Sequence, residues 1–334
     1  MSKIYTTKEK RVRNLKIAAI ILAAVLVVSS ALFFIGLWER HRNQYPQQEI
    51  ATASARISYN GKEYGLKNNI ETVLILGLDK FETENAESYN NDKQADFLML
   101  LVIDHEKQSC TALHINRDTM AEMPVLGVAG DKVGTVTKQI ALAHTYGNGK
   151  EVSCRNTADA VSWLLNNVEI DHYVSVTMDA VSVYTDLVGG VEVTVLDDFT
   201  GIDDTLVKGE TVTLTGEHAL NYVRTRYGLE DSTNSHRMVR QRQFVEALYS
   251  KTIECLENNS GFAVEAGAKL SDYIVSDYTG NGLQQLAEKI SGYQFVEICE
   301  LEGENVVGEK HIEFYPDEES VTETVVKLFY EPIG

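Results

Sequence analysis

Short apolar runs alternate with amphipathic segments along most of this chain. The runs TVLILGL (72–78) and FLMLLVI (97–103) are apolar at consecutive positions, so both faces of each would be buried. This pattern is typical of interior strands in a sheet that is covered on both sides. The segment 111–115 follows the second run after the turn-like HEKQS, which predicts an antiparallel neighbour.

Helical spacing of apolar residues marks the segments between these strands. Capping residues support several of them, such as Thr215 and Asp317 before a helix and the pair Gly189–Gly190 after one. The expected helices cover residues 135–147, 156–168 (capped by Asn156), 178–190, 214–223, 235–256, 283–291 and 317–329. Further strands are expected at 56–59, 172–177, 191–195 and 293–300. The pattern predicts an α/β fold, with a mixed β-sheet and helices on both faces.

The amino-terminal part of the chain has a different character. Residues 17–38 form an apolar run of 22 residues, long enough to cross a bilayer as a helix. We expect residues 1–16 to be a cytoplasmic tail, 17–38 a transmembrane helix and 39–67 a polar extracellular linker. The domain itself would span 68–334, with a core at 70–258 and a carboxyl-terminal extension of the same domain at 259–334.

Charge sets the expected orientation of this segment. Six basic residues precede the apolar run, whereas the four residues after it are closer to balanced, so the positive-inside rule keeps the amino terminus in the cytoplasm. A cleaved signal peptide is the alternative. Its apolar region would be shorter, and the small-residue stretch ATASA (51–55) lies well beyond the run. The favoured interpretation is an uncleaved single-pass anchor in the cell membrane, with the domain that follows it on the extracellular side.

The distribution of arginine is uneven. The formal net charge is −19 for the whole chain and +6 for the first 42 residues, so the remainder carries −25. That remainder holds eight arginines, of which five lie between residues 224 and 242: Arg224, Arg226, Arg237, Arg240 and Arg242. Arginine pairs bidentately with phosphate or carboxylate, so this cluster predicts an anion site. An acidic domain of this charge is a poor partner for nucleic acid.

The position of the cluster strengthens the prediction. Arg237 and Arg240 share one face in the first turns of the expected helix 235–256. Cations are disfavoured at a helix amino terminus unless an anion binds there as well. The alternative is a solvated basic face that pairs with nearby glutamates.

Two carboxylates also stand out by position. Asp96 begins the most apolar strand, and Asp118 follows Arg117 at the end of its expected antiparallel partner, so both would lie at one sheet edge. Magnesium binds one or two carboxylates together with substrate phosphate oxygens. Asp96 and Asp118 are therefore candidate Mg²⁺ ligands; ordinary strand-end aspartates are the alternative.

The four cysteines (Cys110, Cys154, Cys255 and Cys299) match no zinc or redox spacing. An extracellular position permits disulfides, and free buried thiols are an equal alternative.

These motifs together resemble the LytR-CpsA-Psr (LCP) family of bacterial envelope proteins. The resemblance rests on ILGLD (75–79), ADFLMLLVID (95–104), INRDT (115–119), LVGGVEVTV (187–195), LTGEHALNYVRTR (214–226) and HRMVRQR (236–242), in that order. It covers residues 70–250 closely and the rest loosely.

The resemblance implies a function and a set of site residues. Members transfer anionic glycopolymers, such as teichoic acid or capsular polysaccharide, from a polyprenyl-pyrophosphate carrier to a peptidoglycan hydroxyl with the help of Mg²⁺. By resemblance, Asp96 and Asp118 would bind the metal and take part in catalysis with Arg117, Arg224 and Arg226. The pyrophosphate would be held by Arg117, Arg224, Arg226, Arg237, Arg240 and Gln241.

The sequence departs from the family pattern at two positions. Gln94 stands where many members have arginine, and Asn234 stands where many have aspartate. Glu230 and Asp231 lie near Asn234 and are candidates to compensate. The identity of a general base is therefore open.

Two other functions remain as alternatives. One is a hydrolase that cleaves polyprenyl pyrophosphate, and the other is a non-catalytic envelope protein that binds lipid.

We predict the topology from the charge asymmetry around residues 17–38. Protease added to intact, wall-stripped cells should degrade residues 43–334 and spare the amino-terminal tail, as read by antibodies to each end. Protection of the large domain would contradict the extracellular assignment.

Overall fold

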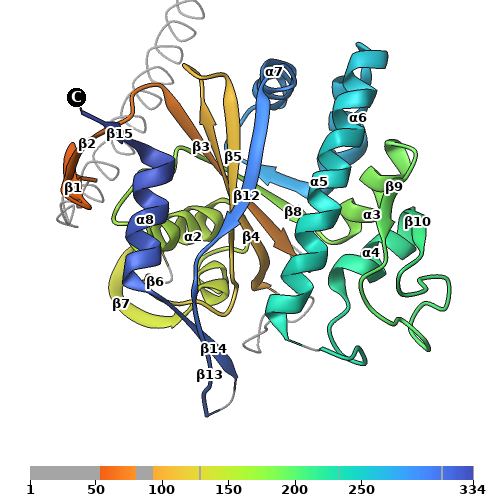
Figure 1. The fold of residues 1–334 in the computed structure, drawn as a ribbon, viewed down its shortest axis with the longest axis horizontal. Helices are drawn as coiled ribbons and strands as arrows, with labels where there is room; N and C mark the ends of the chain where they lie inside the picture. Colours follow the sequence, from red (N-terminus) through yellow and green to blue (C-terminus); the bar gives the residue numbers. More distant parts are fainter. Residues whose placement is uncertain (1–52, 80–92, 128, 232, 310, 334) are drawn as a thin grey trace, which may run out of the picture. The chain divides into compact units, whose positions relative to one another are not determined.

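The computed structural model describes residues 53–79, 93–127, 129–231, 233–309 and 311–333 (Figure 1). Within these ranges no helix is long and apolar enough to cross a membrane. The expected cytoplasmic tail, transmembrane helix 17–38 and first part of the linker lie outside the described residues, so the anchor remains a prediction.

The described domain is built around a six-stranded mixed sheet with the order β11-β8-β3-β4-β5-β12 (Figure 1). Its strands are β3 (Ile70–Leu78), β4 (Ala95–Asp104), β5 (Ser109–Ile115), β8 (His172–Thr177), β11 (Ile274–Ser276) and β12 (Gln294–Glu300). The central pairs β3–β4 and β4–β5 are antiparallel, whereas β8 joins β3 and β12 joins β5 in parallel. The mixed sheet expected from the sequence is confirmed.

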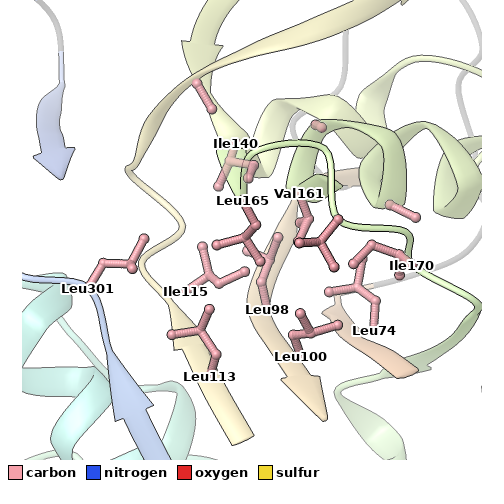
Figure 2. Packing of buried hydrophobic residues seen from close by; sticks show 14 of the residues in the cluster. Leu74, Leu98, Leu100, Leu113, Ile115, Ile140, Val161, Leu165, Ile170 and Leu301 are labelled. Atoms are coloured by element: carbon pink, nitrogen blue, oxygen red, sulfur yellow. The ribbon is translucent and has the colours of Figure 1, made fainter. Parts of the chain in front are cut away.

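The two apolar runs are interior strands because their alternate side chains enter different cores. Leu74 and Leu76 of β3 belong to the main core, whereas Val73 belongs to a smaller core on the other face. Figure 2 shows leucines and isoleucines of β3, β4 and β5 packed against Val161 and Leu165. Burial on both faces explains why these strands read as nearly continuous apolar runs.

Helices cover both faces, as the pattern predicted. Val161 of α2 and Val325 of α8 pack into the main core, and Leu286 and Ile290 of α7 pack against the smaller one. The helices are η2 (Ile140–Thr145), α2 (Glu151–Leu164), α3 (Asp179–Leu187), α4 (Gly216–Arg224), α5 (Asn234–Asn258), α6 (Phe262–Leu270), η3 (Ser271–Tyr273), α7 (Gly280–Ile290) and α8 (Glu318–Phe329).

Four small sheets complete the domain. They are β1 (Arg56–Tyr59) with β2 (Lys62–Leu66) and β15 (Tyr330–Pro332), β6 (Met120–Leu126) with β7 (Lys132–Gln139), β9 (Val191–Thr194) with β10 (Thr211–Leu214), and β13 (Gly303–Val307) with β14 (Ile312–Pro316). Strand β1 confirms the expected strand at 56–59. Of the others, only β9 was expected. Most of the rest pair as hairpins of consecutive strands, and only β15 pairs with a distant strand, β2.

A third core joins the helices that lead into the arginine cluster. Val191 and Val193 of β9, Tyr222 of α4 and Phe244 of α5 are all buried in it. This packing fixes the end of α4 against the start of α5.

One expected helix, residues 135–147, is wrong. Residues up to Gln139 form strand β7, and only a short 3₁₀ helix, η2, follows. The β-branched residues Thr135, Val136 and Thr137 suit the antiparallel pairing with β6, which overrides the helical spacing. The glycine signal was nevertheless sound, since Gly147 has a φ of +97° after η2.

The expected cap of the next helix is also wrong. Helix α2 begins at Glu151, and Asn156 lies inside it rather than at its start. The buried Asn156 side chain donates hydrogen bonds from Nδ2 to the carbonyls of Pro124 (3.2 Å) and Ala143 (2.9 Å). Asn156 therefore ties α2 to neighbouring segments, a role that local sequence does not reveal.

All four cysteines are free thiols. Cys110 and Cys154 are buried, and burial raises the pKa of Cys110 to about 11 and that of Cys154 to about 12. Both are protonated and unreactive near neutral pH. Free thiols, one of the two alternatives, are what the structure shows.

We predict unequal effects of alanine at the two glycines after α3. Gly189 (φ +81°) and Gly190 (φ +96°) are both left-handed, but only at Gly190 would a Cβ meet a neighbour, Thr213 Cγ2, at 2.5 Å. Gly189→Ala should cost about 1–2 kcal/mol from backbone strain alone, and Gly190→Ala should cost more. Urea midpoints of the two variants would check this; equal losses would mean that the contact with β10 is unimportant.

Candidate active site at the edge of the central sheet

The antiparallel register of β4 and β5 brings the two predicted carboxylates together at one end of these strands. Leu98 pairs with Ile115, so Asp96 at the start of β4 lies beside Arg117 and Asp118, which follow β5. Arg117 lies between the two carboxylates. Its Nη1 forms an ion pair with Asp96 Oδ1, and its Nε lies 3.5 Å from Asp118 Oδ1.

Asp118 is held by neutral groups as well as by Arg117. Gln139 Nε2, at the end of β7, donates to its Oδ1 (2.9 Å), and the Asp118 backbone N–H donates to Asn116 Oδ1 (3.0 Å). Burial raises the pKa of Asp118 above its usual value, against the lowering effect of Arg117, Arg226 and Arg237. The surrounding positive charge is therefore close enough to act on this carboxylate.

Arg237 enters the same place from the first turn of α5. Thr233 caps this helix by accepting from the His236 backbone N–H at 3.3 Å. Arg237 Nη2 donates to Asn234 Oδ1 (2.6 Å) and to the Asp96 carbonyl (3.3 Å). Burial and then the charges of Arg117 and Arg226 lower the pKa of Arg237 to about 10, so it stays protonated at neutral pH.

Arg226 approaches from the end of α4. It is partly exposed, its guanidinium lies 4.7 Å from the centre of the Tyr227 ring, and its charge acts on both Arg117 and Arg237. Arg224 lies further out and pairs with Asp79 at 3.0 Å, just beyond β3. Arg117 and Arg237 thus both contact Asp96, and Arg226 lies close enough for its charge to act on both of them.

Several buried polar atoms in this region lack hydrogen-bond partners in the described part of the chain, among them two guanidinium N–H groups, Arg117 Nε and Arg237 Nε. Such atoms are rare in folded proteins and need a partner. An anion would satisfy the Arg237 N–H and would also reduce the repulsion among three neighbouring guanidinium groups.

Arg240 has other partners than an anion. Its side chain is fully buried, with Nη1 2.7 Å from Asp197 Oδ2 and Nη2 donating to the Thr225 carbonyl. Gln241 Nε2 likewise donates to the Val223 carbonyl at 3.2 Å. Direct anion contact therefore stays a prediction that the geometry favours for Arg117, Arg226 and Arg237. Direct contact by Arg240 and Gln241 stays a prediction from the resemblance.

The sequence model of the LytR_cpsA_psr family matches residues 39–329, which is most of the chain. The chain belongs to the LytR-CpsA-Psr family. A relative from Enterococcus faecalis, named polyisoprenyl-teichoic acid–peptidoglycan teichoic acid transferase TagU, is 29% identical over 280 residues, covering 81% of this chain and 82% of that protein. The protein of that name from Halalkalibacterium halodurans is 29% identical over 236 residues, covering 70% and 69%.

The fold is shared with solved members of the family. The crystal structure of Bacillus subtilis TagV superposes with a TM-score of 0.59 at 23% identity, covering 78% of this chain and 98% of that one. This likeness concerns the fold and confirms the mixed α/β architecture.

The two residues that depart from the common LCP pattern both contact arginines of the candidate site. Gln94 Oε1 accepts from Arg117 Nη2, and Asn234 Oδ1 accepts from Arg237. Asn234 also donates to Asn116 Oδ1 at 2.7 Å. The suggested compensating residues have other partners: Glu230 pairs with Lys208 at 2.6 Å, and Asp231 accepts from the Thr233 backbone N–H at 2.8 Å. Neutral amides thus replace charged groups around the cluster.

Several residues of the site were not identified from the sequence. Asn116 links Asp118 to Asn234, Gln139 holds Asp118, and Asp79 pairs with Arg224. Asn116 and Asp79 lie within the family motifs INRDT and ILGLD, which could have drawn attention to them. Gln139 carries no such signal, because the sequence predicts a helix over its segment, 135–147.

Asp96 and Asp118 are residues of the type that binds a magnesium ion. Mg²⁺ prefers oxygen ligands and uses few carboxylates together with phosphate, and Asp96 and Asp118 supply two carboxylates next to the proposed anion. No group of three His, Cys, Asp or Glu residues able to hold a metal occurs among the described residues. A metal would therefore be bound through these two aspartates and the anion together, with Arg117 already contacting both aspartates.

We predict that the alanine variants of the arginines fall into two classes. Arg226→Ala and Arg237→Ala should each weaken binding of inorganic pyrophosphate by about ten- to a hundredfold, since a hydrogen bond to a charged group contributes roughly 1.5–3 kcal/mol. Lysine should restore only part of this, because it lacks the planar fork. Isothermal titration of the full-length protein in detergent would measure the affinities.

Arg242 provides the matched control on the same helix. Its Nη1 pairs with Glu300 of β12, and no ion pair joins it to Asp96 or Asp118 among the described residues. Arg242→Ala should leave pyrophosphate affinity within about twofold. Equal, small losses in all three alanine variants would indicate a diffuse basic surface.

Proposed function

We propose that this protein transfers an anionic glycopolymer, of the teichoic acid or capsule type, from a polyprenyl-pyrophosphate carrier to a peptidoglycan sugar hydroxyl. The observation that carries the proposal is the convergence of Arg117, Arg226 and Arg237 beside Asp96 and Asp118 at one sheet edge. The names of the E. faecalis and H. halodurans relatives describe the same class of reaction.

The proposed reaction is a phosphoryl transfer that the positive charge of the site would assist. The acceptor hydroxyl attacks the phosphorus that carries the glycan, the bond from this phosphorus to the bridging oxygen breaks, and polyprenyl phosphate leaves. The product is a phosphodiester between glycan and peptidoglycan, and the hydroxyl proton passes to solvent or to a base. Arg117, Arg226 and Arg237 would bind the pyrophosphate oxygens and stabilise the charge that develops on the leaving phosphate.

The aspartates have a separate role in this proposal. Asp96 and Asp118 would hold Mg²⁺, which when bound would neutralise negative charge on the pyrophosphate. Asp118 is fixed by Gln139 and Asn116, so its carboxylate is oriented before substrate arrives.

We also propose the location of the reaction. An anchor at residues 17–38, with the amino terminus in the cytoplasm, would place the domain on the outer side of the cell membrane. Both the lipid-linked donor and the peptidoglycan acceptor would be within reach there.

We predict both products of transfer from one assay. Full-length protein in detergent is incubated with a polyprenyl-pyrophosphate oligosaccharide, Mg²⁺ and peptidoglycan fragments, and products are read by mass spectrometry. The proposal expects glycan–peptidoglycan phosphodiester and polyprenyl phosphate in equal amounts. Glycan phosphate without the conjugate would identify a hydrolase, and donor binding without either product would identify a binding protein.

Asparagine variants test the metal ligands in the same assay. Asp96→Asn and Asp118→Asn should lose most of the activity, about a hundredfold or more if each removes a metal contact or its outer support. Asp104→Asn is the matched control. Asp104 is the last residue of β4, at the other end of the strand from Asp96, and it accepts from the Lys107 backbone N–H at 2.9 Å. Full activity of Asp96→Asn or Asp118→Asn would show that the aspartate is not required.

A further inference from the structure

The arginines of the RTR segment, Arg224 and Arg226, lie where α4 ends. Thr225 between them is the carboxyl-terminal cap of the helix and has an extended backbone. The last carbonyls of a helix have no partners within it. Two side chains of α5 supply partners here: Arg240 donates to the Thr225 carbonyl and Gln241 to the Val223 carbonyl at 3.2 Å.

The hydrogen bond from Arg240 to the Thr225 carbonyl depends on a buried carboxylate that holds the Arg240 side chain. Asp197, which follows β9, is 2% exposed and accepts from Arg240 Nη1 at 2.7 Å and from His236 Nε2 at 2.6 Å. The guanidinium of Arg240 also lies 5.3 Å from the centre of the Phe199 ring. Asp197, Phe199 and Thr225 together define a single position for this fully buried side chain.

We infer that Asp197 is a positioning residue for the anion site, acting through Arg240 and the Thr225 carbonyl to fix the direction in which Arg226 enters the site. The inference rests on the proposed function only in taking pyrophosphate as the anion. Asp197 itself pairs with none of Arg117, Arg226 and Arg237 among the interactions of the described residues.

Loss of the Asp197 charge has a defined consequence. An unpaired buried guanidinium is strongly unfavourable, so Arg240 would move toward water or another acceptor. The Thr225 carbonyl would lose its donor, and the backbone next to Arg226 would gain freedom. Arg226 would then have to be ordered when the anion binds, which weakens affinity.

The first test measures binding of farnesyl pyrophosphate with Mg²⁺ to the full-length protein in detergent by isothermal titration. Asp197→Asn should bind about tenfold more weakly, comparable to loss of one well-placed charged hydrogen bond. The double variant Asp197→Leu/Arg240→Met removes the ion pair with apolar residues, which is far less disruptive to folding than leaving one charge unpaired. It should show a similar loss with near wild-type thermal stability.

A matched control separates this role from general stability. Asp203 is another buried aspartate with a histidine partner, accepting from His218 Nδ1 at 2.7 Å, and it also contacts α4 through Asn221 Nδ2 at 3.1 Å. Among the described residues it forms no hydrogen bond or ion pair with Thr225 or with the arginines of the site. Asp203→Asn should destabilise the domain yet leave farnesyl pyrophosphate affinity within about twofold.

Double-mutant cycles identify the route. If Asp197 acts through Arg226, the loss caused by Asp197→Asn should largely disappear in an Arg226→Ala background and persist in an Arg237→Ala background. The same comparison with the double variant shows whether its loss reflects Arg226 placement rather than direct contact by Arg240.

The outcomes are distinct. Wild-type affinity in folded Asp197→Asn or in the double variant overturns the inference, and so does full additivity with Arg226→Ala. Failure of the wild-type protein itself to bind farnesyl pyrophosphate instead overturns the proposed function.

Discussion

Repulsion among three guanidinium groups is the constraint on which the site depends. Arg117, Arg226 and Arg237 come from three separate segments. Burial and then the charge of Arg226 lower the pKa of Arg117, and burial followed by the charges of Arg117 and Arg226 lowers the pKa of Arg237. Asp96 and Asp118 offset part of this charge. Two carboxylates do not neutralise three arginines, so an added anion stabilises the arrangement. The site is thus poised for a polyanionic group such as pyrophosphate.

A site of this kind must be held by the surrounding structure. The β4–β5 register fixes Asp96 against Arg117, and Gln139 connects Asp118 to the Ile312 carbonyl of β14. Phe314 donates from its backbone N–H to the Asp118 carbonyl at 2.9 Å. The carboxyl-terminal extension therefore forms part of the support of the site, although the family motifs end well before it.

The fully buried Arg240 shows that arginines close together in the sequence have different partners in the structure. The sequence predicts anion contact for four of the five arginines within residues 224–242 and leaves out Arg242, which pairs with Glu300. Among the four, Arg240 pairs with Asp197 and Arg224 with Asp79. Arg226 and Arg237 remain to face Arg117. Concentration of charge indicates the region, and the partners of each guanidinium divide the arginines into those with internal ion pairs and those that face Arg117.

The sequence by itself determined the elements whose signals are local. Continuous apolar runs gave β3 and β4, capping residues placed the starts of α4 and α8, and strand order placed Asp96 beside Asp118. The tertiary structure decided what depends on partners outside the segment itself: β7 as a strand paired with β6 instead of a helix, Asn156 as an internal tie, and Arg240 as a donor to the Thr225 carbonyl. The backbone carbonyls that accept these hydrogen bonds have no signature in the sequence, and strand propensity depends on the neighbouring strand. Such partners are therefore set only when separate segments pack together.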